Sequence, residues 1–214
     1  RTGKSMGESC EDMAKTWQIT REDQDLLAYE SHQKAAAAYA RGFYADLVMP
    51  FRELSVDNIL RADTNLAKLA SLKPAFDKRS GKGTLTAGNS TNLSDGASVA
   101  LLSSEQWAHD NNKEIQAYMV DAQVAAVDFV AGEGLLMAPA WAVAQLLKRN
   151  NLKLQDFDFY EIHEAFAAQV LCTLKAWESE EFCKTKLGMD GALGSIDRSK
   201  LNVVGSSLAL GHPF

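Results

Sequence analysis

The sequence has few cysteines, and those it has do not form a pattern. Cys10, Cys172 and Cys183 are the 3 cysteines among 214 residues. An odd number without metal-ligand spacing argues against a disulfide framework and favours a reducing compartment. No apolar run approaches the length of a membrane span. Because the chain starts at Arg1 and not at methionine, the sequence does not exclude a targeting segment.

Several motifs that would name a reaction class are missing. The chain has no Gly-x-Ser-x-Gly element, which argues against a serine hydrolase. Gly132-Glu133-Gly134 lacks the third glycine of a dinucleotide-binding loop. His163-Glu164 is followed by Ala167 where a zinc motif needs a second histidine, so we expect no metal site.

Charge is also unevenly distributed. The net charge of -6 argues against nucleic acid as a partner. Residues 61–82 are the exception, with six basic residues against two acidic ones. This stretch is either a solvated surface or a dock for an anionic ligand such as a nucleotide phosphate. A content of 46% hydrophobic and 23% charged residues is otherwise typical of a soluble globular protein.

The hydrophobic pattern predicts helices that alternate with short strands. We expect an edge strand or extended arm over 47–51. Near residue 82 the sequence changes from mixed polar and basic to β-prone, and we place a domain boundary there. Together these elements predict an α/β layer fold with a largely buried sheet. The helices are expected over 6–14, 20–41, 66–72, 139–149 and 165–177; the strands over 84–87, 116–130, 157–162 and 201–204, with a further buried segment over 95–102.

Two histidines follow the last two predicted strands. His163 stands where the strand 157–162 gives way to a helix, and His212 stands in a Gly-His-Pro corner. Acyl transfer needs one group to activate a nucleophile and another to hold an oxyanion. Each histidine taken alone is equally consistent with a structural role, His163 in the core and His212 in a turn.

The motifs around these histidines, taken in order, resemble the thiolase family. His-Glu-Ala-Phe-Ala-Ala-Gln begins at His163, and Gly-His-Pro-Phe ends the chain. Met6-Gly7-Glu8-Ser9, Lys73-Pro74-Ala75-Phe76-Asp77 and the run from Thr86 to Ala97 match further thiolase motifs. Many thiolases have Asn-Glu-Ala-Phe at the first motif. The histidine variant resembles the branch that contains the β-subunits of fatty-acid-oxidation trifunctional complexes.

The resemblance implies a thiolase fold, of which this chain would be a fragment. Residues 1–82 would form most of a helical and irregular loop domain, and residues 83–214 the first part of the layered C-terminal α/β domain. The N-terminal domain, with its nucleophilic cysteine, and the C-terminal end, with a second cysteine, would be absent. We therefore expect the fragment alone to be inactive.

The same resemblance implies roles for the two histidines in an acyltransferase. A cysteine thiolate would attack the 3-keto carbon of a 3-ketoacyl-CoA, and coenzyme A would take up the shortened acyl group. His212 would generate the thiolate, while His163 would donate to the oxyanion. Glu164 would orient a partner without transferring a proton.

Substrate contacts carry over residue by residue. Arg61 matches an arginine beside the nucleotide of coenzyme A, and Met6 a methionine near the acyl end. Thr91 stands where many thiolases have serine. Coenzyme A would be a substrate, with no permanently bound cofactor. The matching apolar pantetheine contacts are Leu72, Phe76, Ala87 and Phe166.

We therefore predict an enzyme that cleaves 3-ketoacyl-CoA with coenzyme A in fatty-acid β-oxidation. A biosynthetic acetoacetyl-CoA thiolase and a non-catalytic acyl-CoA-binding or lipid-binding relative are the alternatives. The resemblance implies a homodimer, associated in the trifunctional branch with a hydratase/dehydrogenase α-subunit. It implies a cytoplasmic location in a bacterium, or else the mitochondrial matrix.

Overall fold

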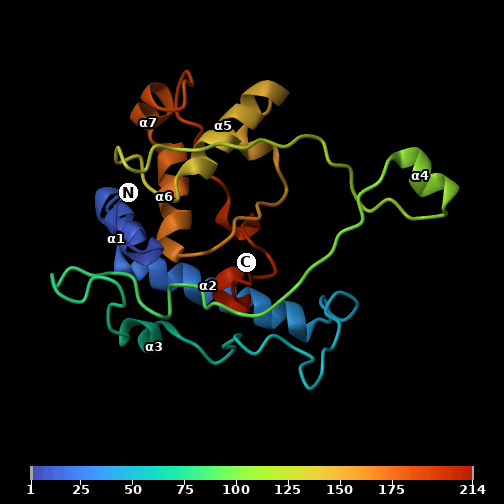
Figure 1. Cartoon of the computed structure of the whole chain (residues 1–214), viewed down its shortest axis with the longest axis horizontal. Helices are drawn as coiled ribbons and strands as arrows, with labels where there is room; N and C mark the ends of the chain where they lie inside the picture. The colour runs from blue at the N-terminus through green and yellow to red at the C-terminus, as the bar shows by residue number, and fades with distance from the viewer. Residues whose placement is uncertain (1, 214) are drawn as a thin grey trace.

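The computed structural model describes residues 2–213, and helices form its framework. Figure 1 shows α2 running across the body, with α1, α5 and α6 above it and α3 below it. No helix among the described residues is long and apolar enough to cross a membrane. The helices are α1 (Met6–Thr16), α2 (Arg21–Ala40), α3 (Leu66–Ala70), α4 (Glu105–Asp110), α5 (Ala138–Asn150), α6 (Ala167–Glu178), α7 (Glu180–Thr185) and α8 (Ser207–Leu210), with short 3-10 helices η1 (Leu154–Asp156) and η2 (Arg198–Lys200).

Side-chain caps fix where the first two helices begin. Ser5 accepts from the backbone N–H of Glu8, and the Glu8 carboxylate accepts from the N–H of Ser5 in return, which completes a capping box. Thr20 accepts from the N–H of Asp23 and starts α2 at the place predicted. Helix α5 ends at Asn150, and the residue that caps it, Asn151, has a left-handed φ of 54°. The predicted helices are thus confirmed to within a few residues at their ends.

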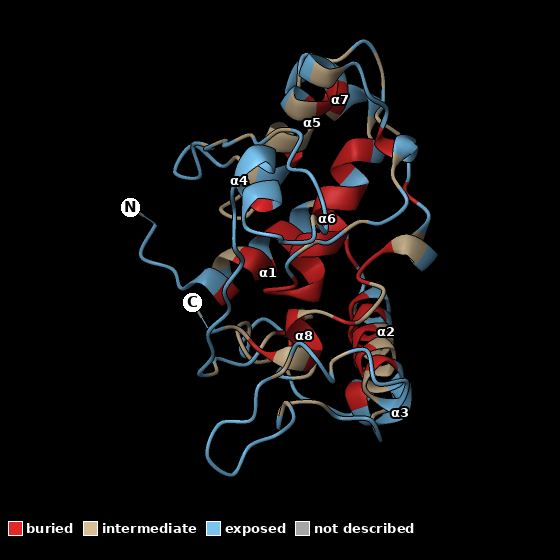
Figure 2. Cartoon of the chain, turned by 90° about the vertical axis from the view of Figure 1, so that its right-hand side faces the viewer, coloured by how far each residue is buried: buried red, intermediate tan, exposed pale blue. Residues whose placement is uncertain are grey.

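Helix α6 is the centre of the core. Figure 2 shows that α6 is buried along most of its length, whereas α4 is largely exposed. Val170, Cys172 and Ala176 are fully buried. Helices α1, α2, α5 and α7 all contact α6. A helix that is apolar on nearly all sides is stable only when other elements surround it in this way.

The alanine-rich stretch of α2 lets another part of the chain approach closely. Ala35 and Ala38 are fully buried. Gly205 packs against this stretch with a φ of +81°, and a Cβ at its position would lie 2.6 Å from Cβ of Ala35 and 2.7 Å from the carbonyl oxygen of Ser31. The turn after residue 202 can therefore lie on α2 only because neither side presents a large side chain there.

The strands predicted from the sequence are not present as ladders. The described residues contain isolated bridges only, because no second segment runs beside any of these stretches for long enough to add further hydrogen-bonded pairs. The predicted strands over 157–162 and 201–204 are reduced to one parallel bridge between Tyr160 and Leu201. The other bridges join Phe51 to Leu54, Pro74 to Thr86, Ser90 to Phe166 and Leu93 to His212.

Two apolar stretches expected to be buried are instead exposed. Val99, in the predicted buried segment 95–102, is 98% exposed, and Val124, in the predicted strand 116–130, is 88% exposed. Figure 1 shows the chain on both sides of α4 running far from the helical body. Asp121, in the segment after α4, forms a two-point ion pair with Arg149 of α5 and so attaches this segment to the helical body. A β-prone composition alone does not bury a segment that lacks a neighbour.

The close approach at Gly205 gives a first prediction, that Gly205→Ala destabilises the chain. A side chain at positive φ costs about 1–2 kcal/mol, and the clash with α2 adds about 1–3 kcal/mol of overpacking. Gly188→Ala is the matched control, because Gly188 also has a positive φ, of +64°, but no atom lies within 4 Å of its Cβ position. Urea unfolding followed by circular dichroism should show the larger loss for Gly205→Ala. Equal losses in both variants would contradict this packing.

Candidate active site

His163 lies on the segment that leads into α6. This segment runs parallel to the one that ends in α8, since Tyr160 N–H donates to the Lys200 carbonyl at 3.0 Å and Asn202 N–H donates to the Tyr160 carbonyl at 2.8 Å. His163 itself is exposed, whereas Glu164 directly after it is buried. Neighbouring residues of an extended segment point to opposite sides, so the histidine faces outward while the carboxylate faces the interior.

His212 is held in place by its backbone. Its N–H donates to the Asn92 carbonyl at 2.9 Å, and its carbonyl accepts from Ser94 N–H at 3.3 Å. Gly211 before it has a φ of +93°, and a Cβ there would lie 2.5 Å from Oγ of Ser94 and 2.7 Å from Cδ1 of Ile59. The corner that presents His212 therefore requires glycine.

The two histidines, distant in the sequence, meet in the structure. Their ring centroids are 4.4 Å apart and their planes stand at 83°, so the edge of one ring meets the face of the other. Partial burial, and then the nearby charge of His212, lower the pKa of His163. Both effects favour the neutral imidazole of His163, which can both donate and accept a hydrogen bond.

A buried carboxylate holds the segments behind this pair together. Glu164 is 1% exposed, and its two oxygens accept from Ser31 Oγ at 2.7 Å, Asn202 Nδ2 at 2.7 Å and Leu208 N–H at 3.3 Å. These donors come from α2, from the segment before α8 and from α8 itself. Burial raises the pKa of the Glu164 carboxyl, while the three hydrogen bonds oppose that shift.

Asn202 and Ser207 complete the connection. Asn202 has a φ of 45°, accepts from Ile162 N–H at 2.8 Å and donates to the Ile162 carbonyl at 2.8 Å. Ser207 Oγ accepts from Glu164 N–H at 3.2 Å and lies 2.5 Å from Nδ1 of His163. The His163 ring is thus fixed to the same unit that carries His212.

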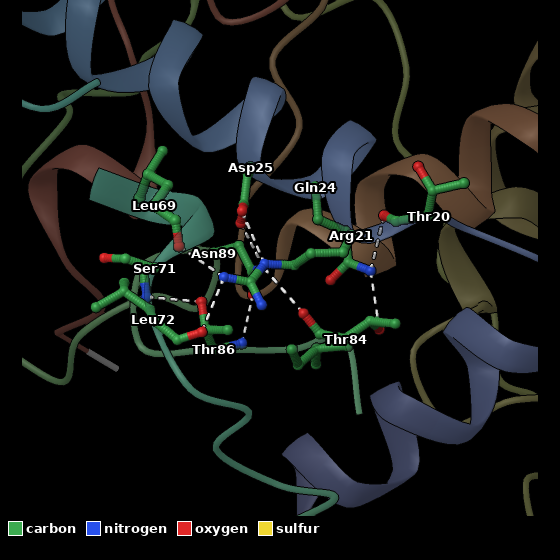
Figure 3. Close-up of polar contacts among 12 residues, drawn as sticks. Thr20, Arg21, Gln24, Asp25, Leu69, Ser71, Leu72, Thr84, Thr86 and Asn89 are labelled. Atoms are coloured by element: carbon green, nitrogen blue, oxygen red, sulfur yellow. Dashed lines mark hydrogen bonds and ion pairs between the residues drawn. The ribbon is translucent and has the colours of Figure 1, made fainter. Parts of the chain in front are cut away.

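A second buried polar network holds the loop after residue 83 (Figure 3). Asn89 donates to Asp25 of α2 at 2.9 Å and accepts from Thr86 N–H at 2.7 Å, and Arg21 donates to the other oxygen of Asp25 at 2.7 Å. Glu11 of α1 accepts from Thr84 N–H at 2.8 Å. The Asn89 carbonyl in turn accepts from Ala167 N–H at 3.0 Å at the start of α6. This loop therefore connects α1 and α2 to the helix that follows His163.

Four of the residues predicted to contact coenzyme A lie around this loop. The rings of Phe76 and Phe166 make an edge-to-face contact with centroids 5.8 Å apart. The Phe76 ring also covers Gly7, so that a Cβ at Gly7 would lie 2.0 Å from it; Met6 beside it is 53% exposed. Thr91 donates to the Ser207 carbonyl at 2.7 Å.

The other three predicted contacts are Leu72, Ala87 and Arg61. Leu72 and Ala87 are exposed. A Cβ on Gly88 would lie 2.6 Å from Cδ1 of Leu72, so Leu72 packs against the residue that follows Ala87. The Arg61 guanidinium folds back on its own turn, donating to the Asn58 carbonyl at 2.8 Å and to the Ile59 carbonyl at 2.9 Å. In this arrangement the Arg61 guanidinium is engaged by the carbonyls of its own turn.

Two family models together match nearly the whole chain. The model described as the thiolase N-terminal domain matches residues 1–106, and the one described as the thiolase C-terminal domain matches residues 113–214. The chain belongs to the thiolase family. A 3-ketoacyl-CoA thiolase of Enterobacter sp. (strain 638) is 45% identical over 219 residues, and one of Serratia proteamaculans (strain 568) is 44% identical. Each match covers 100% of this chain and 49% of the relative.

Solved structures confirm the thiolase fold predicted from the sequence. An acetyl-CoA acetyltransferase from Bacillus anthracis superposes with a TM-score of 0.76 at 37% identity. A thiolase from Ascaris suum in complex with coenzyme A gives a TM-score of 0.78 at 31% identity. Each match covers 98% of this chain and 50% of the other chain. The chain thus spans about half the length of the thiolases that it matches, and the domain boundary near residue 82 stays a prediction.

The three cysteines of this thiolase chain are buried in the core. Cys10, Cys172 and Cys183 all carry free thiols. Burial raises the pKa of Cys10 and brings that of Cys172 to about 12. Cys183 donates to the carbonyls of Ala176 and Trp177. A nucleophilic cysteine needs an accessible, readily formed thiolate, so these thiols have the wrong environment for that role. No group of three or more potential metal ligands occurs among the described residues.

Sequence reasoning missed the residues that support the histidines. Ser31 and Ser207 are ordinary serines in the sequence, and neither belongs to a motif that predicts its partner. Asn202 carries a weak signal, since asparagine tolerates the left-handed backbone conformation better than most residues. His32 on α2 was also missed; it is 6% exposed and accepts from Arg61 N–H at 3.2 Å.

His32 gives a second prediction, on pH. Burial, and then the charge of Arg61, lower the pKa of His32 below the usual value of about 6.5. The unfolded chain therefore binds this proton more readily, and the contribution of His32 to stability is lost as the pH falls below about 6.5. Hydrogen exchange of residues 57–62, corrected for intrinsic rates, should show less protection at pH 5.5 than at pH 7.5. His32→Asn keeps a hydrogen-bond acceptor but does not titrate, so it should abolish this difference; a difference that persists in His32→Asn would refute the assignment.

Proposed function

We propose that this chain supplies the histidine-bearing part of a 3-ketoacyl-CoA thiolase. The observation that carries the proposal is the contact between His163 and His212, whose rings meet at 4.4 Å. His163 is exposed and His212 is half-buried, while Glu164 behind them is buried, so a substrate would approach the pair from the His163 side. The names of the 3-ketoacyl-CoA thiolase relatives support the same activity.

The chemistry divides the work between the two rings. His212 takes the proton of a cysteine thiol, so that the thiolate attacks the 3-keto carbon of the substrate. The bond between the α and β carbons breaks, acetyl-CoA leaves as its enolate and is protonated, and the acyl group remains on the cysteine. A second coenzyme A then takes up that group. His163 donates a hydrogen bond to the oxygen that gains negative charge.

The nucleophile lies outside these 214 residues in this proposal. The support is the burial of Cys10, Cys172 and Cys183 and the raised pKa of the first two. Buried thiols with a raised pKa give almost no thiolate at pH 7. We therefore propose that the chain alone does not turn over substrate and that a longer protein carries the reactive cysteine.

Coenzyme A is the substrate that the surroundings of the histidines fit best. The rings of Phe76 and Phe166 contact each other, and Thr91 donates to the carbonyl of Ser207 beside His163; apolar rings of this kind suit pantetheine. The exposed basic residues Lys78 and Arg79 lie on the adjoining loop, and an exposed positive surface favours a nucleotide phosphate. Arg61 would reach this phosphate only after releasing the carbonyls of its own turn.

Degradation of fatty acids is the direction that we propose, because the His-Glu-Ala-Phe motif resembles the trifunctional branch. The acetyl-CoA acetyltransferase name of the Bacillus anthracis structure keeps acetoacetyl-CoA synthesis as the alternative. A homodimer, association with a hydratase/dehydrogenase α-subunit, and a cytoplasmic or mitochondrial location remain predictions from the same resemblance.

The third prediction tests the roles of the two histidines in the full-length protein. His212→Ala should slow alkylation of the nucleophilic cysteine by iodoacetamide at pH 7, because the thiolate is no longer generated. His163→Ala should leave alkylation nearly unchanged, since no oxyanion forms in that reaction. It should lower thiolytic turnover by on the order of 100- to 1000-fold, the effect of removing one oxyanion donor.

Two further variants make this test specific. His163→Asn restores a hydrogen-bonding side chain of the commoner thiolase type and should recover part of the turnover. His109→Ala, on the exposed helix α4, is the control for loss of a histidine as such. Alkylation slowed equally in His163→Ala and His212→Ala would overturn the division of roles, and full turnover in both would overturn the proposed function.

A further inference from the structure

We infer that Ser207 is a positioning residue that fixes the tautomer of His163, with the proton on Nε2. The inference starts from the contact between Ser207 Oγ and His163 Nδ1 at 2.5 Å. Its consequence for catalysis rests on the proposed function, whereas the tautomer itself does not.

Counting the protons around Ser207 Oγ decides the direction of this hydrogen bond. The oxygen already accepts from Glu164 N–H at 3.2 Å. Its own hydroxyl proton needs an acceptor, and Nδ1 of His163 is the acceptor that the described residues offer it. If Nδ1 donated instead, the hydroxyl proton of Ser207, which is only 7% exposed, would be left without an acceptor among those residues. Ser207 therefore donates, and Nδ1 accepts.

Ser207 is itself fixed firmly enough to impose this choice. Its carbonyl accepts from Thr91 Oγ1 at 2.7 Å, and the Glu164 that donates to its hydroxyl is anchored by three hydrogen bonds of its own. The residue before it, Ser206, donates its N–H to Ser31 of α2 at 3.1 Å. Ser207 is thus fixed by the loop at Thr91, by the segment at Glu164 and, through Ser206, by helix α2. The position of its hydroxyl therefore determines the orientation of the imidazole.

The tautomer restricts what His163 can do. A neutral imidazole carries one proton, so an accepting Nδ1 leaves Nε2 as the donor. Nε2 of His163 can then stabilise a developing oxyanion, but it cannot take a proton from a thiol. The base must be His212, and Ser207 is the residue that separates the two roles.

Nitrogen NMR of the 214-residue chain, labelled with 15N in its histidines, tests the tautomer directly. The His163 signals are assigned by their loss in His163→Asn. We expect Nδ1 of His163 to have the shift of an unprotonated ring nitrogen at pH 7.5, and Nε2 that of a protonated one. The opposite pattern would overturn the inference without any reference to enzymatic activity.

Variants test whether Ser207 is the cause. In Ser207→Ala the Nδ1 and Nε2 shifts of His163 should move toward each other, as the two tautomers mix, and in Ser207→Thr they should stay as in the wild type. Ser206→Ala is the matched control, because its hydroxyl makes only a 3.4 Å contact with the Ile162 carbonyl and does not touch the ring. An unchanged His163 tautomer in Ser207→Ala would refute the role of Ser207.

The full-length protein supplies the kinetic readout. Ser207→Ala should lower kcat by about 10- to 100-fold, which is the scale seen when the orienting partner of a metal-bound histidine is lost. The KM for coenzyme A should change little, because Ser207 acts on the ring that holds the oxyanion. A KM effect without a kcat effect would contradict the role in catalysis. The two ideas fail separately. An unchanged His163 tautomer in Ser207→Ala would refute the inference, whereas absence of thiolysis in the wild-type full-length protein would refute the proposed function.

Discussion

The arrangement of the two histidines depends on the buried carboxylate of Glu164. This side chain is 1% exposed and accepts hydrogen bonds from α2, from Asn202 and from the start of α8. A buried carboxylate without donors would be strongly destabilising, so these segments cannot separate without leaving it unsatisfied. His163 precedes Glu164 in the chain and His212 follows α8 closely. One interaction thus sets the positions of both rings, and the extended segments that carry them need only one bridge between them.

Helix α2 carries Ser31, one of the donors to Glu164, and anchors the loops around the site. Ser31 and Ala35 contact the turn that leads to α8. Asp25 accepts a hydrogen bond from Asn89, and His32 accepts one from the backbone N–H of Arg61. Three loops that are far apart in the sequence therefore meet on a single rigid element. A site held to about 0.5 Å is best built on such an element, which suits chemistry in which two imidazoles must keep distinct roles.

The sequence predicted the helices well and the strands poorly, for different physical reasons. Local signals determine helix ends, and Ser5, Thr20 and Asn151 act as such signals here. A strand needs a paired strand beside it, and the apolar stretch around Val124 forms no bridge among the described residues. His163 and His212 were singled out by their positions after two predicted strands, and the motif resemblance then assigned their roles. Ser31, Asn202 and Ser207 could not be found, because their partners are set by contacts between distant segments and the residues themselves are common polar types.

The most direct test of this account is the free energy of unfolding of Glu164→Gln, measured at pH 8 by urea denaturation. An amide offers one acceptor oxygen and turns an N–H group toward donors that need an acceptor. We predict a loss of at least about 2 kcal/mol, since an unsatisfied buried donor alone costs about 1–3 kcal/mol. Glu161→Gln, at an exposed carboxylate in the same segment, should change stability by less than about 0.5 kcal/mol. Equal stabilities for the two variants would contradict the claim that the Glu164 carboxylate holds the histidine segments together.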